Sequence, residues 1–332
     1  MLKLIIMLTK QLISLSLALS AAVLSTSLKA QESEIEPPEG SQFTFAYPLG
    51  TNGVDAINVS NEFSFNLLYG VNGGLDGLEI GGLANYNHGE VHGMQLAGVA
   101  NINKERTNGL MWAGGFNLTF EETRGVQLAD FNVAAGDFTG VQAGVVNYAG
   151  RMRGVQLGVI NIVGEDNGAI PIGLINVVRG GYYALEWVSS EALYTNLNYK
   201  MGVEHFYTIF KLGYSWYDDN DTYSIGLGFG SMFTLAEKHK ISMDLSLNQI
   251  VFNEEWDSDH NYLTKFDLSY RYSLGEHVSL IAGPSLNWYA SEIGMDDGAA
   301  MLNIPSHAHK FTSDEYQNWT WLGFNVGVAY KF

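Results

Sequence analysis

The stretch Gly125-Val-Gln-Leu-Ala-Asp-Phe-Asn132 is one copy of a phrase that recurs through the first half of the chain. Each copy joins a glycine to a following asparagine, and the last copy contains Ile170-Pro-Ile-Gly-Leu-Ile-Asn176. The copies begin at the glycines in positions 77, 93, 109, 125, 140, 154 and 168, so the step shrinks from 16 residues to 14. A regular period of this kind predicts a repeat architecture, and it governs how the rest of the chain is interpreted.

Two arrangements of the repeats fit this period. In a β-solenoid the copies stack in parallel, which keeps their common direction and turns the asparagines into a ladder. A coil of that kind needs apolar residues pointing inward from a second side, and polar spacers such as Asn103–Asn108 contain almost none. Spacers of this length suit hairpin turns between antiparallel strands, which is the arrangement that we favour. Still open is the face presented by Asn85, Asn101, Asn117, Asn132, Asn147, Asn161 and Asn176.

From Gly180 onward the strands become longer, and each carries one aromatic-rich face and one small or polar face. Tyr223–Phe233 alternates large apolar residues with serine and glycine, and Trp319–Phe332 repeats the scheme. Such strands are typical of a lipid-facing barrel, whose closure leaves no open edge. We predict an all-β, outer-membrane antiparallel β-barrel with about 16 strands if the repeats form part of the wall. The alternative is a barrel of about eight strands preceded by an N-terminal β-solenoid.

The composition of the chain narrows the possible functions. The 332 residues include 38 glycines and no cysteine, which excludes disulfides, thiolate metal sites and a thiol nucleophile. The formal net charge is −18 at pH 7. So acidic a chain lacks the basic surface with which proteins bind nucleic acid. Because no stretch after residue 30 approaches about 18 uninterrupted apolar residues, we expect no membrane-spanning helix.

Four segments follow one another along the chain. Residues 1–30 carry Lys3 and Lys10 ahead of an apolar run, which predicts a cleaved secretory signal peptide. Residues 31–41 form an acidic lead-in that we expect to be flexible. Residues 42–179 hold the glycine-rich repeats, and residues 180–332 hold the long-stranded barrel region. An exported barrel belongs in the outer membrane of a Gram-negative type of cell.

The sequence of the repeats also resembles that of a known group of proteins. Gly154-Val-Gln-Leu-Gly-Val-Ile-Asn161, Phe43-Thr-Phe-Ala-Tyr-Pro-Leu-Gly50 and the closing Pro171–Gly180 are similar to the surface-repeat proteins of spirochaetes and Bacteroidetes. The resemblance covers residues 42–204, and the copy at Gly109–Asn117 departs from the usual phrase. That family has no established activity, so the resemblance implies location and surface character rather than a reaction.

Two acidic or histidine-containing loops are candidates for metal binding. His307 and His309, with Asp296 and Asp297 upstream, form the closest histidine pair, but no third ligand lies at a defined spacing. The run Asp218-Asp-Asn-Asp221 lacks the glycine and the distal glutamate of an organised calcium loop. A solvated loop and a hairpin turn are therefore the better interpretations.

Enzymatic candidates are equally weak. The residues available to a barrel hydrolase are Ser279, Ser285, Asp267 and His277. No spacing among them singles out a catalytic triad. Glu186 and Glu191 lie where the repeats give way to the long strands, as lumen-facing charges or as part of a turn. We therefore predict no enzymatic activity, no catalytic residue, no metal and no cofactor.

Two functions fit these observations almost equally well. A passive pore for small solutes follows from the length and from the glycine, serine, glutamine and asparagine faces of the strands. A structural or adhesive surface protein follows from the repetition and the acidic loops, and a lipid-modifying barrel enzyme is a third hypothesis. The expected partners are outer-membrane lipid and the barrel assembly machinery, which would recognise the strand ending in Tyr330-Lys-Phe332. The strand count decides whether a lumen is open, because about eight strands leave it filled with side chains.

Overall fold

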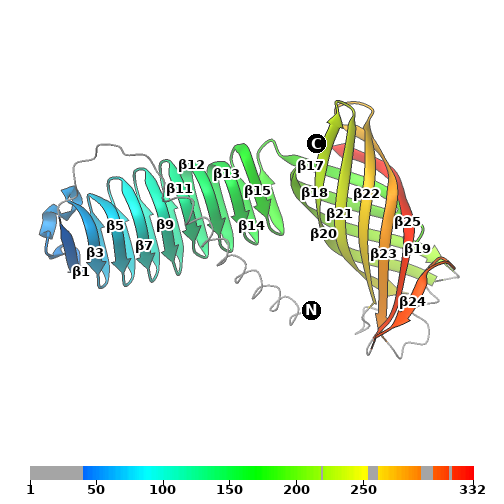
Figure 1. The fold of residues 1–332 in the computed structure, drawn as a ribbon, viewed down its shortest axis with the longest axis horizontal. Helices are drawn as coiled ribbons and strands as arrows, with labels where there is room; N and C mark the ends of the chain where they lie inside the picture. Colours follow the sequence, from blue (N-terminus) through cyan, green and yellow to red (C-terminus); the bar gives the residue numbers. More distant parts are fainter. Residues whose placement is uncertain (1–39, 218–219, 253–260, 293–301, 314–315) are drawn as a thin grey trace. The chain divides into compact units, whose positions relative to one another are not determined.

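The computed structural model describes residues 40–217, 220–252, 261–292, 302–313 and 316–332. The predicted signal peptide and nearly all of the acidic lead-in lie outside these residues. The chain divides into two compact units, Met1–Ala169 and Ile170–Phe332, which we call the repeat unit and the barrel unit (Figure 1). The division falls inside β15 (Asp166–Ile172), whereas the change in strand character follows at Gly180. No helix among the described residues is long and apolar enough to cross a membrane.

The repeat unit is a parallel β-solenoid in which each coil contains a longer strand, a tight corner and a shorter strand (Figure 1). The longer strands are β3 (Ser60–Asn66), β5 (Gly74–Gly81), β7 (Val91–Ala97), β9 (Thr107–Ala113) and β11 (Thr123–Leu128). The shorter strands are β4 (Tyr69–Asn72), β6 (Ala84–Asn87), β8 (Ala100–Asn103), β10 (Phe116–Thr119) and β14 (Ile160–Val163). In β12 (Phe131–Ala143) and β13 (Val146–Leu157) a shorter strand runs on into the next longer one.

The first coil has its own closing elements. β1 (Ser41–Ala46) pairs in parallel with β3, and β2 (Leu49–Gly50) turns back to pair with β1 in antiparallel fashion. The short 3₁₀ helix η1 (Gly53–Asn58) follows before β3 begins. These elements satisfy much of the backbone edge that the first coil of a parallel stack would otherwise leave open.

Successive coils pair residue for residue, so equivalent positions of the repeated phrase form columns. Gly109 pairs in parallel with Gly93 on one side and Gly125 on the other. The asparagines of the shorter strands, including Asn117 and Asn132, pair in the same way. The extra residue of the early copies is absorbed at the end of the longer strand, so it leaves both columns in register.

The glycine column has a steric cause. The φ angle of Gly109 is +143°, a backbone conformation that residues with a side chain rarely adopt. A Cβ atom added at Gly109 would lie 1.8 Å from the carbonyl oxygen of Gly93 in the preceding coil. The repeated glycine is therefore required by the close approach of one coil to the next.

The interior of the coils is lined by columns of amides together with buried apolar side chains, among them Leu75, Val91, Phe138 and Met152. The buried amide columns contain Asn85, Asn101, Asn117, Asn132, Asn147 and Asn161, with Gln95, Gln127, Gln142 and Gln156. Asn101 Nδ2 donates to Asn117 Oδ1 at 3.0 Å. Gln142 Nε2 likewise donates to Gln127 Oε1 at 2.7 Å. Each coil thus satisfies side chains of its neighbour, as asparagine and glutamine ladders do in stacked β structures.

The antiparallel, sixteen-stranded wall that we favoured from the sequence is therefore wrong, and the alternative of a solenoid followed by an eight-stranded barrel is confirmed. The expectation failed because it assumed that a coil must be filled by apolar residues. Hydrogen-bonded amides fill much of it instead, and buried apolar residues such as Leu75, Val91 and Phe138 fill the rest.

The barrel unit closes eight long antiparallel strands into a ring (Figure 1). The strands are β17 (Tyr182–Ser190), β18 (Thr195–Val203), β19 (Phe206–Tyr217), β20 (Asn220–Ala236), β21 (His239–Phe252), β22 (Asn261–Ser273), β23 (Val278–Glu292) and β25 (Tyr316–Lys331). The ring is closed by β17, which pairs with β25 from Ala184 opposite Lys331 to Ser190 opposite Asn325. The short β24 (His309–Thr312) pairs with β25 beyond this stretch.

The two faces of the barrel wall have opposite character. Outward positions carry large apolar side chains such as Leu212, Leu322 and Phe324, which are more than half exposed. Charged side chains in the middle of the strands are buried in the interior, and they are Glu186, Lys200, Lys211, Asp244, Lys265, Asp267 and Arg271. An apolar outside and a polar inside are the pattern that a barrel in lipid requires.

The two ends of the barrel differ in their connections. At one end the hairpins are closed by short turns at residues 204–205, 237–238 and 274–277. The first strand of the ring begins at this end, and the last strand ends there, because Tyr182 pairs with Gly202 and Val278 with Tyr330. At the other end the connections differ in length: residues 191–194 and 218–219 are short, whereas 253–260 and 293–315 are longer.

The last repeat packs on the outside of the barrel wall near the short turns. Met201 and Thr208 occupy outward positions on β18 and β19, yet they are buried beneath β16 (Ile175–Val178) and the turn before it. Thr208 Oγ1 donates to the carbonyl oxygen of Gly173 at 2.6 Å and accepts a hydrogen bond from Asn176 Nδ2 at 2.8 Å. Within the barrel unit, this end of the repeats therefore lies against the outward side of the wall.

Candidate functional site

A cluster of buried charges crosses the barrel interior close to the short-turn end. Lys200 Nζ lies 2.5 Å from Asp244 Oδ2 and 3.1 Å from Glu186 Oε1. Arg271 Nη2 lies 2.5 Å from the same oxygen of Glu186. Tyr207 donates its hydroxyl proton to Asp244 Oδ1 at 2.6 Å. Because these residues come from β17, β18, β19, β21 and β22, the cluster cross-links most of the wall through the lumen.

The cluster is electrically balanced, with two cations and two carboxylates. Balance matters because a buried ion costs several kcal/mol unless a partner compensates it. The ring of Tyr207 adds a second contact to Lys200, whose Nζ lies 4.8 Å from the ring centroid. Arg271 Nε is also satisfied, because it donates to Ser242 Oγ at 2.8 Å. Chemically, this arrangement holds strands together and fills space.

A second polar layer lies beside this cluster. Asp267 lies 3.5 Å from Lys211 Nζ and 3.8 Å from Lys265 Nζ. Lys211 also donates to Ser246 Oγ at 3.2 Å, and Asn325 Nδ2 donates to Asp267 at 3.4 Å. The two layers together bring charged or amide side chains from most of the strands into the lumen.

The loop end of the lumen is closed by a carboxylate and an apolar cluster. Glu191 accepts hydrogen bonds from Asn287 Nδ2 at 2.9 Å, Trp321 Nε1 at 2.7 Å and the backbone N–H of Phe324 at 3.0 Å. Next to it pack the buried side chains of Ala192, Leu193, Ile250, Leu263, Tyr289, Leu302, Trp319 and Trp321. Leu302 comes from the long connection between β23 and β24, so this connection contributes to the closure.

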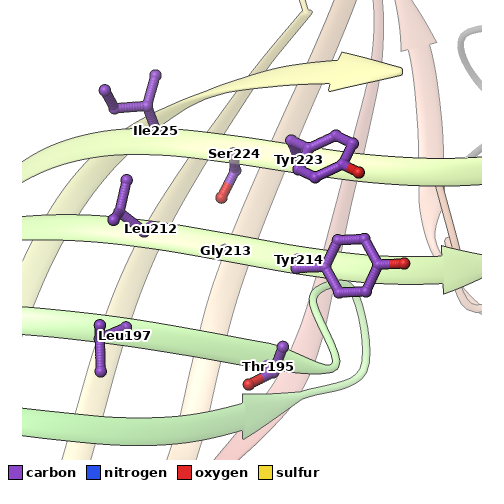
Figure 2. A pocket seen from close by; sticks show the side chains of 8 residues that line it. All are labelled: Thr195, Leu197, Leu212, Gly213, Tyr214, Tyr223, Ser224 and Ile225. Carbon is purple, nitrogen blue, oxygen red and sulfur yellow. The ribbon is translucent and has the colours of Figure 1, made fainter. Parts of the chain in front are cut away.

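A shallow hollow on the barrel lies on the outward side of the wall. Figure 2 shows it over β18, β19 and β20, lined by Leu197, Leu212, Tyr214, Tyr223 and Ile225, among others. Leu197, Leu212 and Ile225 are 44–56% exposed. The hollow presents apolar side chains and no convergent set of polar groups, so its chemistry suits an acyl chain better than a polar substrate.

The predicted metal-binding residues are not brought together among the residues that the structure describes. His307 Nε2 lies 3.3 Å from the carbonyl oxygen of Leu322, and the ring of His309 stacks on Phe311. Asp296, Asp297 and Asp218 lie outside the described residues. Within the described ranges, no group of three histidine or acidic residues is arranged to hold a metal ion.

The predicted enzymatic residues are dispersed. Ser285 pairs with Asp267 across β23 and β22, but Asp267 is committed to Lys211 and Lys265. His277 lies in a short turn at the barrel end, where its Nδ1 is 2.8 Å from the carbonyl oxygen of Lys331. These contacts give no nucleophile and base in hydrogen-bonding reach.

A buried carboxylate in the repeat unit was not singled out from the sequence. Glu79 occupies the glutamine column, has no exposed surface, and accepts four hydrogen bonds. The donors are Asn72 at 2.6 Å, Asn87 at 2.7 Å, Gln95 at 2.8 Å and Asn66 at 3.0 Å. Burial raises the pKa of Glu79 above its ordinary value, although the four hydrogen bonds act in the opposite direction. Its place in the repeat, where later copies have glutamine or methionine, is the signal that would have found it.

No protein-family model matches this chain, and a search of curated proteins finds no match. The functional argument therefore depends on the geometry of the two units.

Proposed function

We propose that this chain is a non-channel structural protein of the outer membrane, in which a plugged eight-stranded barrel anchors the repeat unit. The observation that carries the proposal is the filled lumen: Lys200, Asp244, Glu186 and Arg271 bridge it, and an apolar cluster caps its loop end. Eight strands enclose space for side chains and not for an aqueous channel. The apolar outer wall supports insertion in lipid, and assembly would proceed through the terminal strand that ends in Tyr330-Lys-Phe332.

Conductance separates this proposal from the passive pore, its nearest rival. The folded chain, reconstituted in planar bilayers, should give no discrete conductance steps. The double variant Lys200→Ala/Arg271→Ala is the matched comparison, because it removes both cations that bridge the lumen. Steady conductance steps from the unmodified chain would show an open pore and overturn the proposal.

We further propose that the repeat unit lies on the periplasmic side. Barrels of the bacterial outer membrane place short turns in the periplasm and longer loops outside. The first strand of this barrel begins at the short-turn end, so the chain that precedes it emerges on that side. This differs from the surface location that the sequence resemblance implies for the repeats, and it leaves the long connection around β24 at the cell surface.

Thiol labelling tests the sidedness cleanly, because the chain contains no cysteine. Thr312→Cys, in β24, and Glu105→Cys, in a spacer of the repeats, are both exposed positions. On intact cells a membrane-impermeant maleimide should label Thr312→Cys and not Glu105→Cys. Opening the outer membrane should make both variants react. Labelling of Glu105→Cys on intact cells would place the repeats outside and contradict the proposed sidedness.

A further inference from the structure

Part of the outer surface of the repeat unit is apolar where that of a soluble solenoid would be polar. In β1, Gln42 is buried, whereas Phe43 beside it is 55% exposed. In β12, Asn132 is fully buried, whereas Phe131 beside it is 52% exposed. Because amide ladders and buried apolar side chains already fill the coils, these outward side chains are not needed to form a core. A continuous exposed apolar surface instead marks contact with another molecule or with a membrane.

Many of the exposed apolar residues lie at the corner between the longer and the shorter strand, with Trp112 and Phe131 beside it on the strands themselves. We call this strip the apolar edge, and its members are Leu83, Val99, Trp112, Phe131, Val145 and Val159. Each is 45–57% exposed. The strip runs through consecutive coils because the corners stack in register: the backbone N–H of Val99 donates to the carbonyl oxygen of Leu83 at 2.8 Å, and that of Val159 donates to Val145 at 3.0 Å.

The opposite side of the coils carries exposed charged side chains, with Phe120 as an exposed apolar residue among them. Arg106 reaches Glu90 in the preceding coil at 3.5 Å and Glu122 in the following coil at 3.6 Å. Arg151 bridges neighbouring coils in the same way. We call the spacers that carry these pairs the charged edge. Exposed ion pairs of this kind contribute little to stability. Their exposed side chains show that this side of the coil is hydrated.

We propose that the repeat unit lies on a phospholipid bilayer with its apolar edge in the hydrocarbon and its charged edge in water. The inference rests on the proposed function, because the barrel is what holds the repeats beside a membrane. A body with an apolar strip and a charged opposite side is the form in which proteins lie in the membrane interface. The amides of the interior remain compatible with this position, because they are hydrogen-bonded within the coils.

Two features favour lipid over a second copy of the chain. Apolar side chains continue from the edge onto both faces of the coil, as with Leu96 on the longer-strand face and Ile102 on the shorter-strand face, which are partly exposed. A bilayer can surround an edge from both sides, whereas a two-fold partner covers one patch. In addition, Asn176 and Gly173 hold the last repeat against the outward side of the barrel wall. The attached barrel raises the effective concentration of lipid at the repeats, so even a weak interface would form.

One residue departs from the pattern and supplies a test. Asp130 is exposed at the corner, in line with Val145 of the next coil. A carboxylate opposes burial in hydrocarbon, so Asp130→Val should draw the edge deeper into lipid. Val145→Asp should have the opposite effect. Because both side chains are exposed in the solenoid, neither change disturbs the amide ladders.

The experiment places single cysteines at Val145 on the apolar edge, at Glu105 on the charged edge and at Leu212 on the outer wall of the barrel. Each variant carries an environment-sensitive fluorophore and is reconstituted in vesicles of phosphatidylethanolamine and phosphatidylglycerol, with or without brominated acyl chains. The Val145 probe should show a blue shift and quenching by bromine comparable to the Leu212 probe. The Glu105 probe should show neither. Asp130→Val should increase the quenching at Val145.

The Leu212 probe separates failure of the inference from failure of the proposed function. Quenching at Leu212 without quenching at Val145 would leave the barrel in lipid and overturn the inference about the repeats. No quenching at Leu212 would overturn the proposed function itself. A blue shift at Val145 that is insensitive to brominated lipid would mean that a second copy covers the edge. Equal quenching at Val145 and Glu105 would also overturn the inference, because the apolar edge and the charged edge would then have the same surroundings.

Discussion

The repeat unit and the barrel both bury polar side chains behind an apolar outer surface, but they satisfy them differently. In the repeat unit, Asn101 and Asn117 bond to equivalents one coil away, so each interaction is local and repeated. In the barrel, Lys200 and Asp244 lie 44 positions apart in the chain and meet once. Loss of one ladder member leaves similar neighbours in place, whereas loss of one barrel ion leaves an uncompensated charge. The comparison predicts that the amide ladders of the repeat unit tolerate a single substitution better than the ion cluster of the barrel does.

The barrel should show the largest effect. Lys200→Met leaves Glu186 and Asp244 with Arg271 alone, so one negative charge inside the barrel loses its partner. We expect the free energy of unfolding of the barrel to fall by about 3–5 kcal/mol, as for other broken buried ion pairs. Urea unfolding in detergent micelles, followed by the gel mobility of the folded form, measures this change.

The matched control is an exposed ion pair of the same barrel. The Lys331 side chain is 43% exposed, and its Nζ lies 3.7 Å from Glu204. Lys331→Met should therefore cost at most about 1 kcal/mol. Equal losses from the two lysine substitutions would contradict the distinction between the buried cluster and the barrel surface.

Glycine in the repeat unit should show the next effect. Gly109→Ala forces a side chain into a φ angle of +143° and into contact with the carbonyl oxygen of Gly93. We expect a loss of about 2–4 kcal/mol from strain and overpacking together. Unfolding of the repeat unit can be followed with a fluorophore on Glu105→Cys.

Gly168→Ala separates the two contributions. The φ angle of Gly168 is +96°, but the nearest atom to an added Cβ lies 4.0 Å away. This variant therefore carries backbone strain of about 1–3 kcal/mol without the clash. If Gly109→Ala is no worse than Gly168→Ala, the coils are not in the close contact that the glycine column implies.

The sequence was sufficient to predict strands and a barrel, but not which faces of the repeats were buried. Alternation along Tyr223–Phe233 identifies an outward face, because a barrel in lipid places large apolar residues there. In the repeats, the assumption of an apolar core made antiparallel strands the favoured arrangement and left the solenoid as the alternative. Only three-dimensional stacking reveals that Asn117 has two asparagine neighbours. The charge cluster was equally out of reach, since Lys200 and Asp244 are joined by closure of the ring and not by spacing.

The acid at Glu79 gives the repeat unit a pH dependence that its amide ladders lack. Because burial raises the pKa of Glu79 above 4.5, the folded state binds the proton more tightly than the unfolded state does. Its contribution to stability is therefore full below about pH 4.5 and is lost as pH rises through the folded pKa. The slope should approach about −1.4 kcal/mol per pH unit in that window. Urea unfolding of the repeat unit at several pH values measures it.

Glu79→Gln is the appropriate control, because it restores the residue type of Gln95 and Gln127 at this position of the repeat. The variant has no titratable group in the column, so the slope above about pH 4.5 should become smaller. A slope that is unchanged in Glu79→Gln would assign the pH dependence to other carboxylates. If the stability of the repeat unit rose with pH in the unmodified chain, this result would contradict a raised pKa at Glu79.

The smallest expected effect is a gain, at the one fully buried methionine that interrupts the glutamine column between Gln95 and Gln127. Gln127 Nε2 now donates to the Met111 sulfur at 3.6 Å, which is a weak acceptor. Met111→Gln would supply an amide oxygen there and an N–H₂ group toward Gln95, continuing the direction in which Gln142 donates to Gln127. Because the two side chains are similar in size, we expect stabilisation of the repeat unit by about 0.5–1.5 kcal/mol. Met111→Leu, which keeps the position apolar, should not stabilise the repeat unit. If Met111→Leu stabilised it as much as Met111→Gln does, the gain would come from packing, and the amide ladder would not be the source of cohesion between coils.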